Sequence, residues 1–538
     1  METIMQIQVR INEEGALRNQ RYAFSDKFTL VSELLQNARR AGATRIEIDH
    51  DAASQTLRIA DDGGGIDDFQ KLLTLNESGW DAATRDEEQP FGIGFSKCLY
   101  SATRCVVTSR HQRVDFETAA ALAKMPIDVA AVPCTDTDDV ASGTVIELHG
   151  VDLPELDTRI ATMCQGFPVT VSFNGKMLDR PFAVGNLPLT PTPVGAVYLT
   201  GTRNGKHHHD TLVFLQGFCV MKPIYHQLDH VNVVHLDSRQ FVARLPDRDK
   251  LIDEEDQRKR IDAALKASWQ QILELAKTQL PPRRFVETYY AAMRAWGHLD
   301  LLNDIGELPS EVCDDIVSYP YQEGGGDCEY LRTVAVVPTR QAIESGEVKL
   351  VALDPVSDEN IGRWMFARAK GHIVFNSIGL HLDHWVQRHV RYPEDEELQV
   401  EAIDERARAT LEGRWIWPEI VLCRAVRVRV GSESVDIADD GVFHDGTLYI
   451  PDGEATGTPV RQASDFTDEH EQFLEADLDA DREALADLIR RLRSVDPKDT
   501  LDSLLQELKL EKYPLLHGRT FRLTVGQVSL GHSVELVN

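Results

Sequence analysis

Three short stretches decide the fold: Glu33-Leu34-Leu35-Gln36-Asn37-Ala38, Asp61-Asp62-Gly63-Gly64-Gly65-Ile66 and Phe91-Gly92-Ile93-Gly94-Phe95. The first lies among apolar residues that recur at helical spacing, and the second follows an alternation of apolar and polar residues that is typical of a strand. The third places a glycine pair before a second helical pattern. In this order, the stretches predict a nucleotide site built from a helix, a strand end and a glycine loop.

The first stretch combines a carboxylate with a carboxamide. Glu33 and Asn37 are four residues apart, so both side chains leave the same face of the helix. A general base that orients a water and an amide oxygen that binds Mg²⁺ are two groups that phosphoryl transfer requires close together. The alternative is a pair of ordinary polar side chains on the solvent face of an amphipathic helix.

The second stretch has the pattern D-x-G-x-G. The carboxylate of Asp61 can accept a hydrogen bond from the amino group of an adenine. Gly63 and Gly65, followed by Ile66, would let the backbone pass close to the ring because glycine has no Cβ. The alternative is a plain acidic turn.

The third stretch offers main-chain N–H groups to phosphate oxygens. Gly92, Ile93, Gly94 and Phe95 precede a helix, and the N-terminus of a helix attracts negative charge. Lys97, one turn into the helix, can reach the same oxygens as a point charge. A G-x-G pattern alone is common and has little specificity.

Taken together, these features resemble the GHKL ATPase superfamily of gyrase, the 90-kDa heat-shock chaperones, histidine kinases and MutL. The shared order is a helix with E-x-x-x-N, a hairpin, D-x-G-x-G, a variable lid, G-x-G-F, and a strand that begins with Gly143-Thr144. The run Ala41-Gly42-Ala43-Thr44 is similar to the A-G-A-T of MutL, and residues 91–95 are similar to the F-G-V-G-F of the chaperones. The resemblance implies a Bergerat fold, in which helices cover one face of a mixed β-sheet, with ATP and Mg²⁺ as cofactors.

The resemblance also implies roles for single residues. Glu33 would be the catalytic base, Asn37 the ligand of an ATP-bound Mg²⁺, Asp61 the residue that reads adenine, and Thr144 its helper.

The chain departs from the family at two positions and in the lid. Arg40 stands where an acid is usual, and it either binds phosphate or makes a salt bridge. Asp62 stands where Asn or Thr is common, and the lid, residues 76–90, is short and acidic.

The second domain extends the resemblance. In gyrase, MutL and the chaperones, a domain of ribosomal-protein-S5 type follows the ATPase domain and sends a basic residue to the γ-phosphate. The run Val234-His235-Leu236-Asp237-Ser238-Arg239 is similar to the L-x-x-S-R-E of the chaperones, so Arg239 is the first candidate for this contact. Arg244 and Arg248 are the alternatives, and all three arginines could instead pair with neighbouring Asp residues on the surface.

The predicted fold class is α+β, divided into four segments. Residues 1–150 would form the ATP-binding domain and residues 151–282 the S5-like α/β middle domain. Residues 283–327 would be a helical connector ending in a glycine-rich linker, and residues 328–538 an α+β domain of unknown role. Helices are predicted near residues 28–38, 67–75, 94–102, 253–280, 466–495 and 498–511. Strands are predicted at residues 45–49, 56–60, 105–108, 143–149, 169–176, 211–215, 417–430 and 446–450.

Composition limits the classes of partner and site. The formal charge is −30, which disfavours a direct nucleic-acid partner although a local basic strip could exist. Eight cysteines without a C-x-x-C pair argue against a zinc ribbon and fit reduced thiols in the cytosol. No signal peptide or long apolar segment is found, so we expect a cytoplasmic protein without a membrane partner. His381, His384 and His389 lack metal-site spacing, and His207-His208-His209 is read as a polar loop.

These observations predict a Mg²⁺-dependent ATPase whose layout is similar to that of the 90-kDa heat-shock chaperones. ATP would drive lid closure and homodimer formation and so act on a protein client or partner. One alternative is an ATP-gated nucleic-acid clamp of the MutL, MORC or topoisomerase kind, and another is a nucleotide-dependent scaffold that does not hydrolyse ATP. A histidine kinase is disfavoured because no phosphoacceptor helix precedes the ATPase domain.

Overall fold

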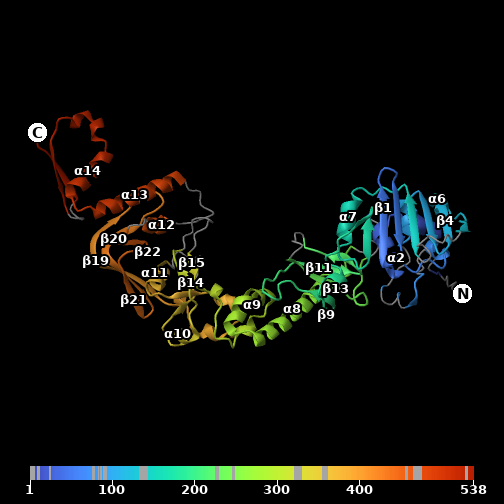
Figure 1. The fold of residues 1–538 in the computed structure, drawn as a ribbon. Helices are drawn as coiled ribbons and strands as arrows, with labels where there is room; N and C mark the ends of the chain where they lie inside the picture. The colour runs from blue at the N-terminus through green and yellow to red at the C-terminus, as the bar shows by residue number, and fades with distance from the viewer. Residues whose placement is uncertain are drawn as a thin grey trace, which may run out of the picture. The chain divides into compact units, whose positions relative to one another are not determined.

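The computed structural model of the chain forms two compact units (Figure 1). The first comprises Met1–Pro281 and Thr288–His298, and the second comprises Pro282–Glu287 and Leu299–Asn538. The structure describes residues 7–8, 12–22, 26–74, 79–82, 84, 88, 94–132, 143–223, 230–244, 249–319, 330–353, 361–454, 458–464, 475–526 and 531–538.

The first unit begins with an eight-stranded mixed sheet, drawn in blue and cyan in Figure 1. Its strand order is β5-β4-β3-β6-β2-β1-β7-β8, and every pair is antiparallel except β1 and β7. The strands are β1 Arg45–Asp51, β2 Thr56–Asp61, β3 Arg104–Ser109, β4 Gln112–Glu117, β5 Val129–Ala131, β6 Thr144–His149, β7 Thr170–Phe173 and β8 Lys176–Met177.

Helices cover one face of this sheet. One apolar cluster contains alternate residues of the strands together with residues of α2, α5 and α7, so these helices pack on the same face. Leu30, Val31 and Leu35 of α2 are completely buried there, and each contributes about 1.5–3 kcal/mol. Gly42, with φ of +77°, ends this helix as expected. The helices are α1 Glu13–Gln20, α2 Thr29–Arg40, α3 Gln70–Leu73, α5 Ser96–Ser101, α6 Thr118–Leu122 and α7 Leu156–Met163.

The first unit also contains a five-stranded middle sheet, a first long helix and the last part, residues 288–296, of a second. The strand order of this sheet is β12-β11-β13-β10-β9. Pro281 and Pro282 separate the helices, because proline cannot continue one helix but suits the first turn of the next. The elements are β9 Thr190–Thr192, β10 Gly195–Tyr198, β11 Thr211–Leu215, β12 Phe218–Met221, β13 Asn232–Leu236, α8 Glu254–Gln279 and α9 Pro282–Trp296.

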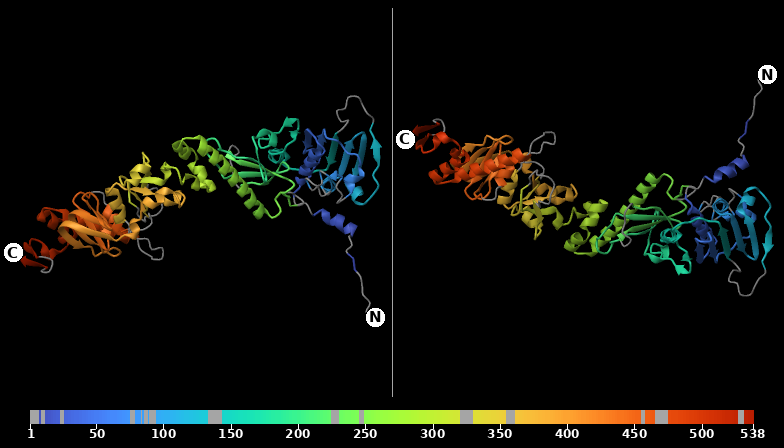
Figure 2. Two further views of the ribbon diagram at one scale, coloured as in Figure 1. Left: turned by 90° about the horizontal axis from the view of Figure 1, so that it is seen from below. Right: turned by 90° about the horizontal axis from the view of Figure 1, so that it is seen from above.

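The second unit contains two five-stranded sheets and a terminal hairpin, coloured yellow to red in both views of Figure 2. The sheets have the orders β15-β14-β17-β16-β18 and β19-β20-β23-β22, with β21 paired to β20. The helices are α10 Arg340–Glu344, α11 Ile361–Ala369, α12 Thr458–Ser464, α13 Glu475–Arg493 and α14 Pro497–Glu507. The strands are β14 Cys313–Ile316, β15 Leu331–Thr333, β16 Leu350–Val351, β17 Ile373–Phe375, β18 Val390–Arg391, β19 Leu398–Thr410, β20 Glu419–Val430, β21 Glu433–Ile437, β22 Val442–His444, β23 Thr447–Pro451, β24 Phe521–Val525 and β25 His532–Leu536.

The α+β class is confirmed, whereas the first sheet extends beyond the predicted boundary at residue 150. The chain crosses over through α7, and β7 then pairs in parallel with the otherwise free edge of β1. The connector is less helical than predicted, because α9 is followed by short 3₁₀ turns and by β14. The predicted linker at 322–327 and the start of the predicted helix at 466 lie outside the described residues.

No helix among the described residues is both long enough and apolar enough to cross a membrane.

Candidate nucleotide site

Asp61 ends β2 in a partly buried position. Its Oδ1 accepts a hydrogen bond from the main-chain N–H of Gly63 at 2.9 Å. Burial raises the pKa of this carboxyl to about 6, and the neighbouring Asp62 carboxylate adds to the increase, while main-chain N–H groups of Gly63 and Thr144 oppose it. The side chain is therefore a carboxylate at neutral pH, but one that is poorly solvated and suited to accept a hydrogen bond from a ligand.

The backbone passes so close to Asp61 that two neighbouring positions require glycine. A Cβ on Gly63 would lie 2.9 Å from Asp61 Oδ1, and a Cβ on Gly143 would lie 1.9 Å from the main-chain oxygen of Asp61. Gly65 has φ of +75°, a conformation that glycine adopts without strain. The turn that follows Asp61 therefore packs closely around its carboxylate, and Gly143, just before β6, lies against the main chain of Asp61.

A hydroxyl pair joins this turn to the neighbouring strands. Thr144 lies opposite Asp61 in the β2–β6 register and opposite Ser109 in the β3–β6 register. Ser109 Oγ accepts from the N–H of Ile66 at 2.9 Å and donates to the oxygen of Gly143 at 2.9 Å. The Thr144 hydroxyl, 3.2 Å away, therefore donates to Ser109, because a serine hydroxyl has one proton. Sequence reasoning missed Ser109, since only strand pairing brings it to this turn.

Glu33 lies on α2 with only 6% of its surface exposed. A Cβ on Gly94 would lie 2.2 Å from Glu33 Oε2, so the backbone that opens α5 packs directly against this carboxylate. Lys97, on the first turn of α5, is also buried. The structure therefore brings α2, which contains Glu33 and Asn37, next to Gly94 of the glycine loop that precedes α5.

Asn37 is followed on α2 by two arginines that share one carboxylate. Arg40 Nε donates to Glu88 Oε2 at 2.8 Å, and Arg39 pairs with the same oxygen. Burial would raise the pKa of Glu88, but the hydrogen bonds and charges of the two arginines outweigh it and lower the pKa. Arg40 Nη1 also donates to Asn37 Oδ1 at 3.5 Å. Of the two alternatives for Arg40, phosphate binding and a salt bridge, the structure contains a salt bridge, made with Glu88.

Gln216, at the turn between β11 and β12, reaches the same helix from the middle sheet. Its main-chain oxygen accepts from Gln36 Nε2 at 3.1 Å, and its own Nε2 donates to the main-chain oxygen of Glu88 at 3.3 Å. The Gln216-Gly217 pair between two apolar strands is a signal for a hairpin turn. No local pattern predicts that this turn meets a helix 180 residues earlier.

The structure describes two of the three arginines that were candidates for the contact with the γ-phosphate. Arg244 Nη2 bonds to Asp249 at 3.2 Å and is more than half exposed, which matches the surface-pair alternative. The main-chain N–H of Arg239 donates to Asp237 Oδ1 at 3.0 Å, and this bond helps to set the turn after β13. Arg248 lies outside the described residues, as do Gly92 and Ile93.

The histidine motifs form ring contacts and polar contacts. His384 is buried, and its Nδ1 accepts from the N–H of Val386 at 3.2 Å. The rings of His208 and His230 stack 4.9 Å apart, and those of His207 and His209 meet edge to face. Within the described part of the chain, no group of three or more His, Cys, Asp or Glu side chains could hold a metal ion.

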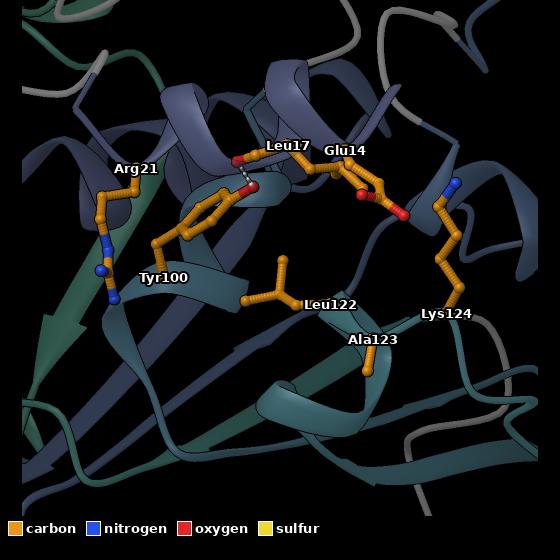
Figure 3. A pocket seen from close by; sticks show the side chains of 7 residues that line it. All are labelled: Glu14, Leu17, Arg21, Tyr100, Leu122, Ala123 and Lys124. Carbon is orange, nitrogen blue, oxygen red and sulfur yellow. Dashed lines mark hydrogen bonds between the residues drawn. The ribbon is translucent and has the colours of Figure 1, made fainter. Parts of the chain in front are cut away.

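A cavity of about 400 Å³ lies beneath α1 (Figure 3). The Tyr100 hydroxyl donates to the main-chain oxygen of Leu17 at 2.8 Å across its wall. None of its lining residues is a candidate site residue, so this cavity is separate from the carboxylates described above. It is lined by Glu14, Leu17, Arg21, Tyr100, Leu122, Ala123 and Lys124.

Comparison with known proteins agrees with this geometry. Residues 26–129 match the family model described as "Histidine kinase-, DNA gyrase B-, and HSP90-like ATPase". No curated protein matches the chain. The matched region contains α2, the Asp61 turn and the start of α5, and the sheet around it is mixed with helices on one face. The chain therefore carries an ATPase domain of the GHKL superfamily.

Proposed function

We propose that the chain binds ATP with Mg²⁺ and hydrolyses it in the site formed by α2, the Asp61 turn and the start of α5. The observation that carries this proposal is the burial of Glu33 against Gly94, with Asn37 one turn further along the same helix. A carboxylate held almost out of solvent beside the backbone of a glycine loop is suited to orient a water at a phosphate bound along that loop.

The residues present fit an adenine nucleotide. Asp61 would accept a hydrogen bond from the adenine amino group, and Gly63, Gly65 and Ile66 would line the ring. The close approach at Gly63, where a side chain would meet the carboxylate, is the local observation that supports this fit. Thr144 would hold the Asp61 end of β2 in place through its hydroxyl pair with Ser109.

The phosphates would lie along the glycine loop. N–H groups of Gly92, Ile93, Gly94 and Phe95 would bind their oxygens, and Lys97 would add a positive charge. Asn37 Oδ1 would be the protein ligand of Mg²⁺, which, when bound, neutralises charge on the phosphates.

Glu33 would act on the attacking water. Its carboxylate would orient the water and take its proton as the oxygen attacks the γ-phosphorus and the bond to the β-phosphate oxygen breaks. Arg239 of the middle domain would bind the γ-phosphate and stabilise the developing charge, with Arg244 and Arg248 as alternatives.

The broader role we propose is that of a heat-shock-protein-90-like machine. ATP would close the lid, join two copies of the chain and so act on a protein partner. The charge of −30 favours a protein partner over the nucleic-acid clamp, and a scaffold that binds ATP without hydrolysis is the remaining alternative. ATP-dependent suppression of client aggregation would support the chaperone role, whereas salt-sensitive DNA binding would support the clamp.

The decisive experiment compares phosphate release from Mg·ATP by the wild type and by Glu33→Gln. The substitution nearly keeps the volume beside Gly94 but removes the proton acceptor, so we expect turnover to fall by about 10²–10⁴-fold. ATP binding, measured by calorimetry, should persist. Glu47→Gln on the partly exposed strand β1 is the matched control and should leave turnover unchanged. Equal turnover in the wild type and Glu33→Gln would remove Glu33 from the role of base.

A further inference from the structure

Three consecutive glycines, residues 63–65, follow two aspartates at the end of β2. Glycine has more backbone freedom to lose than any other residue, so such a run needs contacts from outside to stay ordered. A first set of contacts comes from the chain between α2 and β1. The main-chain N–H of Gly64 donates to the oxygen of Ala41 at 2.8 Å, and Asp62 Oδ1 accepts from the N–H of Thr44 at 2.7 Å.

A second set of contacts comes from the turn between β3 and β4. Arg110 Nε donates to the main-chain oxygen of Gly64 at 2.7 Å, and the same guanidinium forms an ion pair with Asp67. The residue before it, Ser109, accepts the bond from the N–H of Ile66. One arginine side chain therefore ties two points of the segment after Asp61 to the β3–β4 hairpin.

The backbone of this turn is strained. β3 and β4 are joined by Arg110 and His111 alone, because Ser109 and Gln112 already pair with each other. The φ angles of Arg110 and His111 are +45° and +64°. A two-residue turn with positive φ at both positions favours Asn-Gly, whereas arginine and histidine adopt this conformation at a cost. Strain of this kind is concentrated at functional sites, and here the strained residue reaches the glycine run.

We propose that Arg110 is a positioning residue for adenine: it holds the segment 64–67 in the conformation that receives the base before the nucleotide arrives. The inference rests on the proposed function, in which Gly63, Gly65 and Ile66 line the ring. A loop that is ordered in advance loses less conformational entropy when the ligand binds, so the affinity is higher. Arg110 acts through its contacts with the loop and does not touch the ligand.

Positioning and direct contact with phosphate predict different effects on a series of ligands. The contacts of Arg110 order the part of the site that surrounds the base, so ATP and adenosine gain the same factor in affinity. A guanidinium that bound the phosphates would favour ATP over adenosine, because it would make charged hydrogen bonds that adenosine lacks. A comparison of these two ligands therefore separates the two roles.

The first test is calorimetric titration of the full wild-type chain and of Arg110→Asn with ATP and with adenosine. Asparagine tolerates positive φ, so the variant keeps the turn and removes the guanidinium. We expect both affinities to fall by the same factor, about three- to tenfold. The Tm without nucleotide should change by about 2 °C or less, because relief of the strained turn offsets the loss of a half-exposed ion pair.

Arg104→Asn is the matched control for this test. The side chains of Arg104 and Arg110 are both 43% exposed, and each pairs with one aspartate, Asp115 and Asp67 respectively. Arg104 lies at the opposite end of β3 from the turn, and its partner is on β4 rather than in the glycine segment. Its substitution should leave the affinity for both ligands unchanged.

The second test is hydrogen exchange of the main-chain amides in nucleotide-free protein, which reports on the loop without any ligand. In Arg110→Asn, peptides that cover residues 61–67 should exchange about three- to tenfold faster than in the wild type. Peptides from α2 and β6 should exchange as before. Faster exchange throughout the ATPase domain, together with a lower Tm, would make Arg110 a general structural residue and would overturn the inference.

The outcomes separate the inference from the proposed function. A wild type that binds no ATP would overturn both. A wild type that binds ATP, beside an Arg110→Asn variant with unchanged affinity or unchanged exchange at residues 61–67, would overturn the inference alone. A loss of ATP affinity that exceeds the loss of adenosine affinity would show direct contact with phosphate and would overturn it as well.

Discussion

At the residue scale, the candidate site holds a carboxylate whose charge opposes folding. The pKa of Asp61 rises from 3.8 to about 6 because burial disfavours its ionised form. Between pH 3.8 and about 6, the Asp61 carboxyl is therefore protonated more often in the folded protein than in the unfolded chain. The stability that Asp61 contributes is therefore complete below about pH 4 and is lost as the pH rises through about 6.

Asp61→Asn should therefore stabilise the nucleotide-free protein at neutral pH. The amide oxygen can still accept the bond from Gly63, whereas the cost of the buried charge, up to about 3 kcal/mol, disappears. Scanning calorimetry should find a higher Tm for the variant at pH 7.5 and a smaller difference at pH 5. Adenine-nucleotide affinity should fall at the same time. A Tm gain that is equal at both pH values would show that the effect does not come from ionisation.

At the element scale, the position of Glu33 depends on the backbone that opens α5. The three nearest atoms to a Cβ built at Gly94 all belong to the Glu33 side chain, with Oε2 at 2.2 Å. Gly94→Ala should therefore move the carboxylate while leaving the core intact. We expect turnover to fall by about 10²-fold, with a Tm change of a few degrees at most. Gly185→Ala is the control, because nothing lies within 4 Å of its Cβ, and a large Tm loss in Gly94→Ala alone would contradict this account.

The elements that carry the site could be predicted from sequence because their signals are local. The helical spacing of apolar residues and the stop at Gly42 predicted α2. The alternation of apolar and polar residues on both sides of a turn at residues 51–54 predicted the β1–β2 hairpin, and both elements are observed. Ser109 and Gln216 could not be predicted, because strand pairing and the meeting of two sheets bring them to the site. The pairing of β7 with β1 was missed for the same reason.

At the scale of the whole molecule, the buried core of the second unit ends well before the last described residues in the chain. Among the described residues, none after Ile489 is buried. In both views of Figure 2, the red segment that follows α13 lies at one end of this unit. Val495 and Leu515 are 97% and 91% exposed, and the β24–β25 hairpin pairs with no third strand in the described part of the chain. An isolated two-stranded hairpin adds little stability of its own.

A chain that ends at Ser494 should therefore fold as the full chain does. Arg491 Nε donates to Ser503 Oγ, and the loss of this half-buried bond costs about 1 kcal/mol. We expect the calorimetric Tm of the second unit to change by about 2 °C or less. A chain that ends at Ser464 is the control: it loses α13, whose Leu485 is completely buried, and each such side chain contributes about 1.5–3 kcal/mol. The shorter chain should lose cooperative unfolding of this unit, and the same loss in the chain ending at Ser494 would mean that the last segment supports the core.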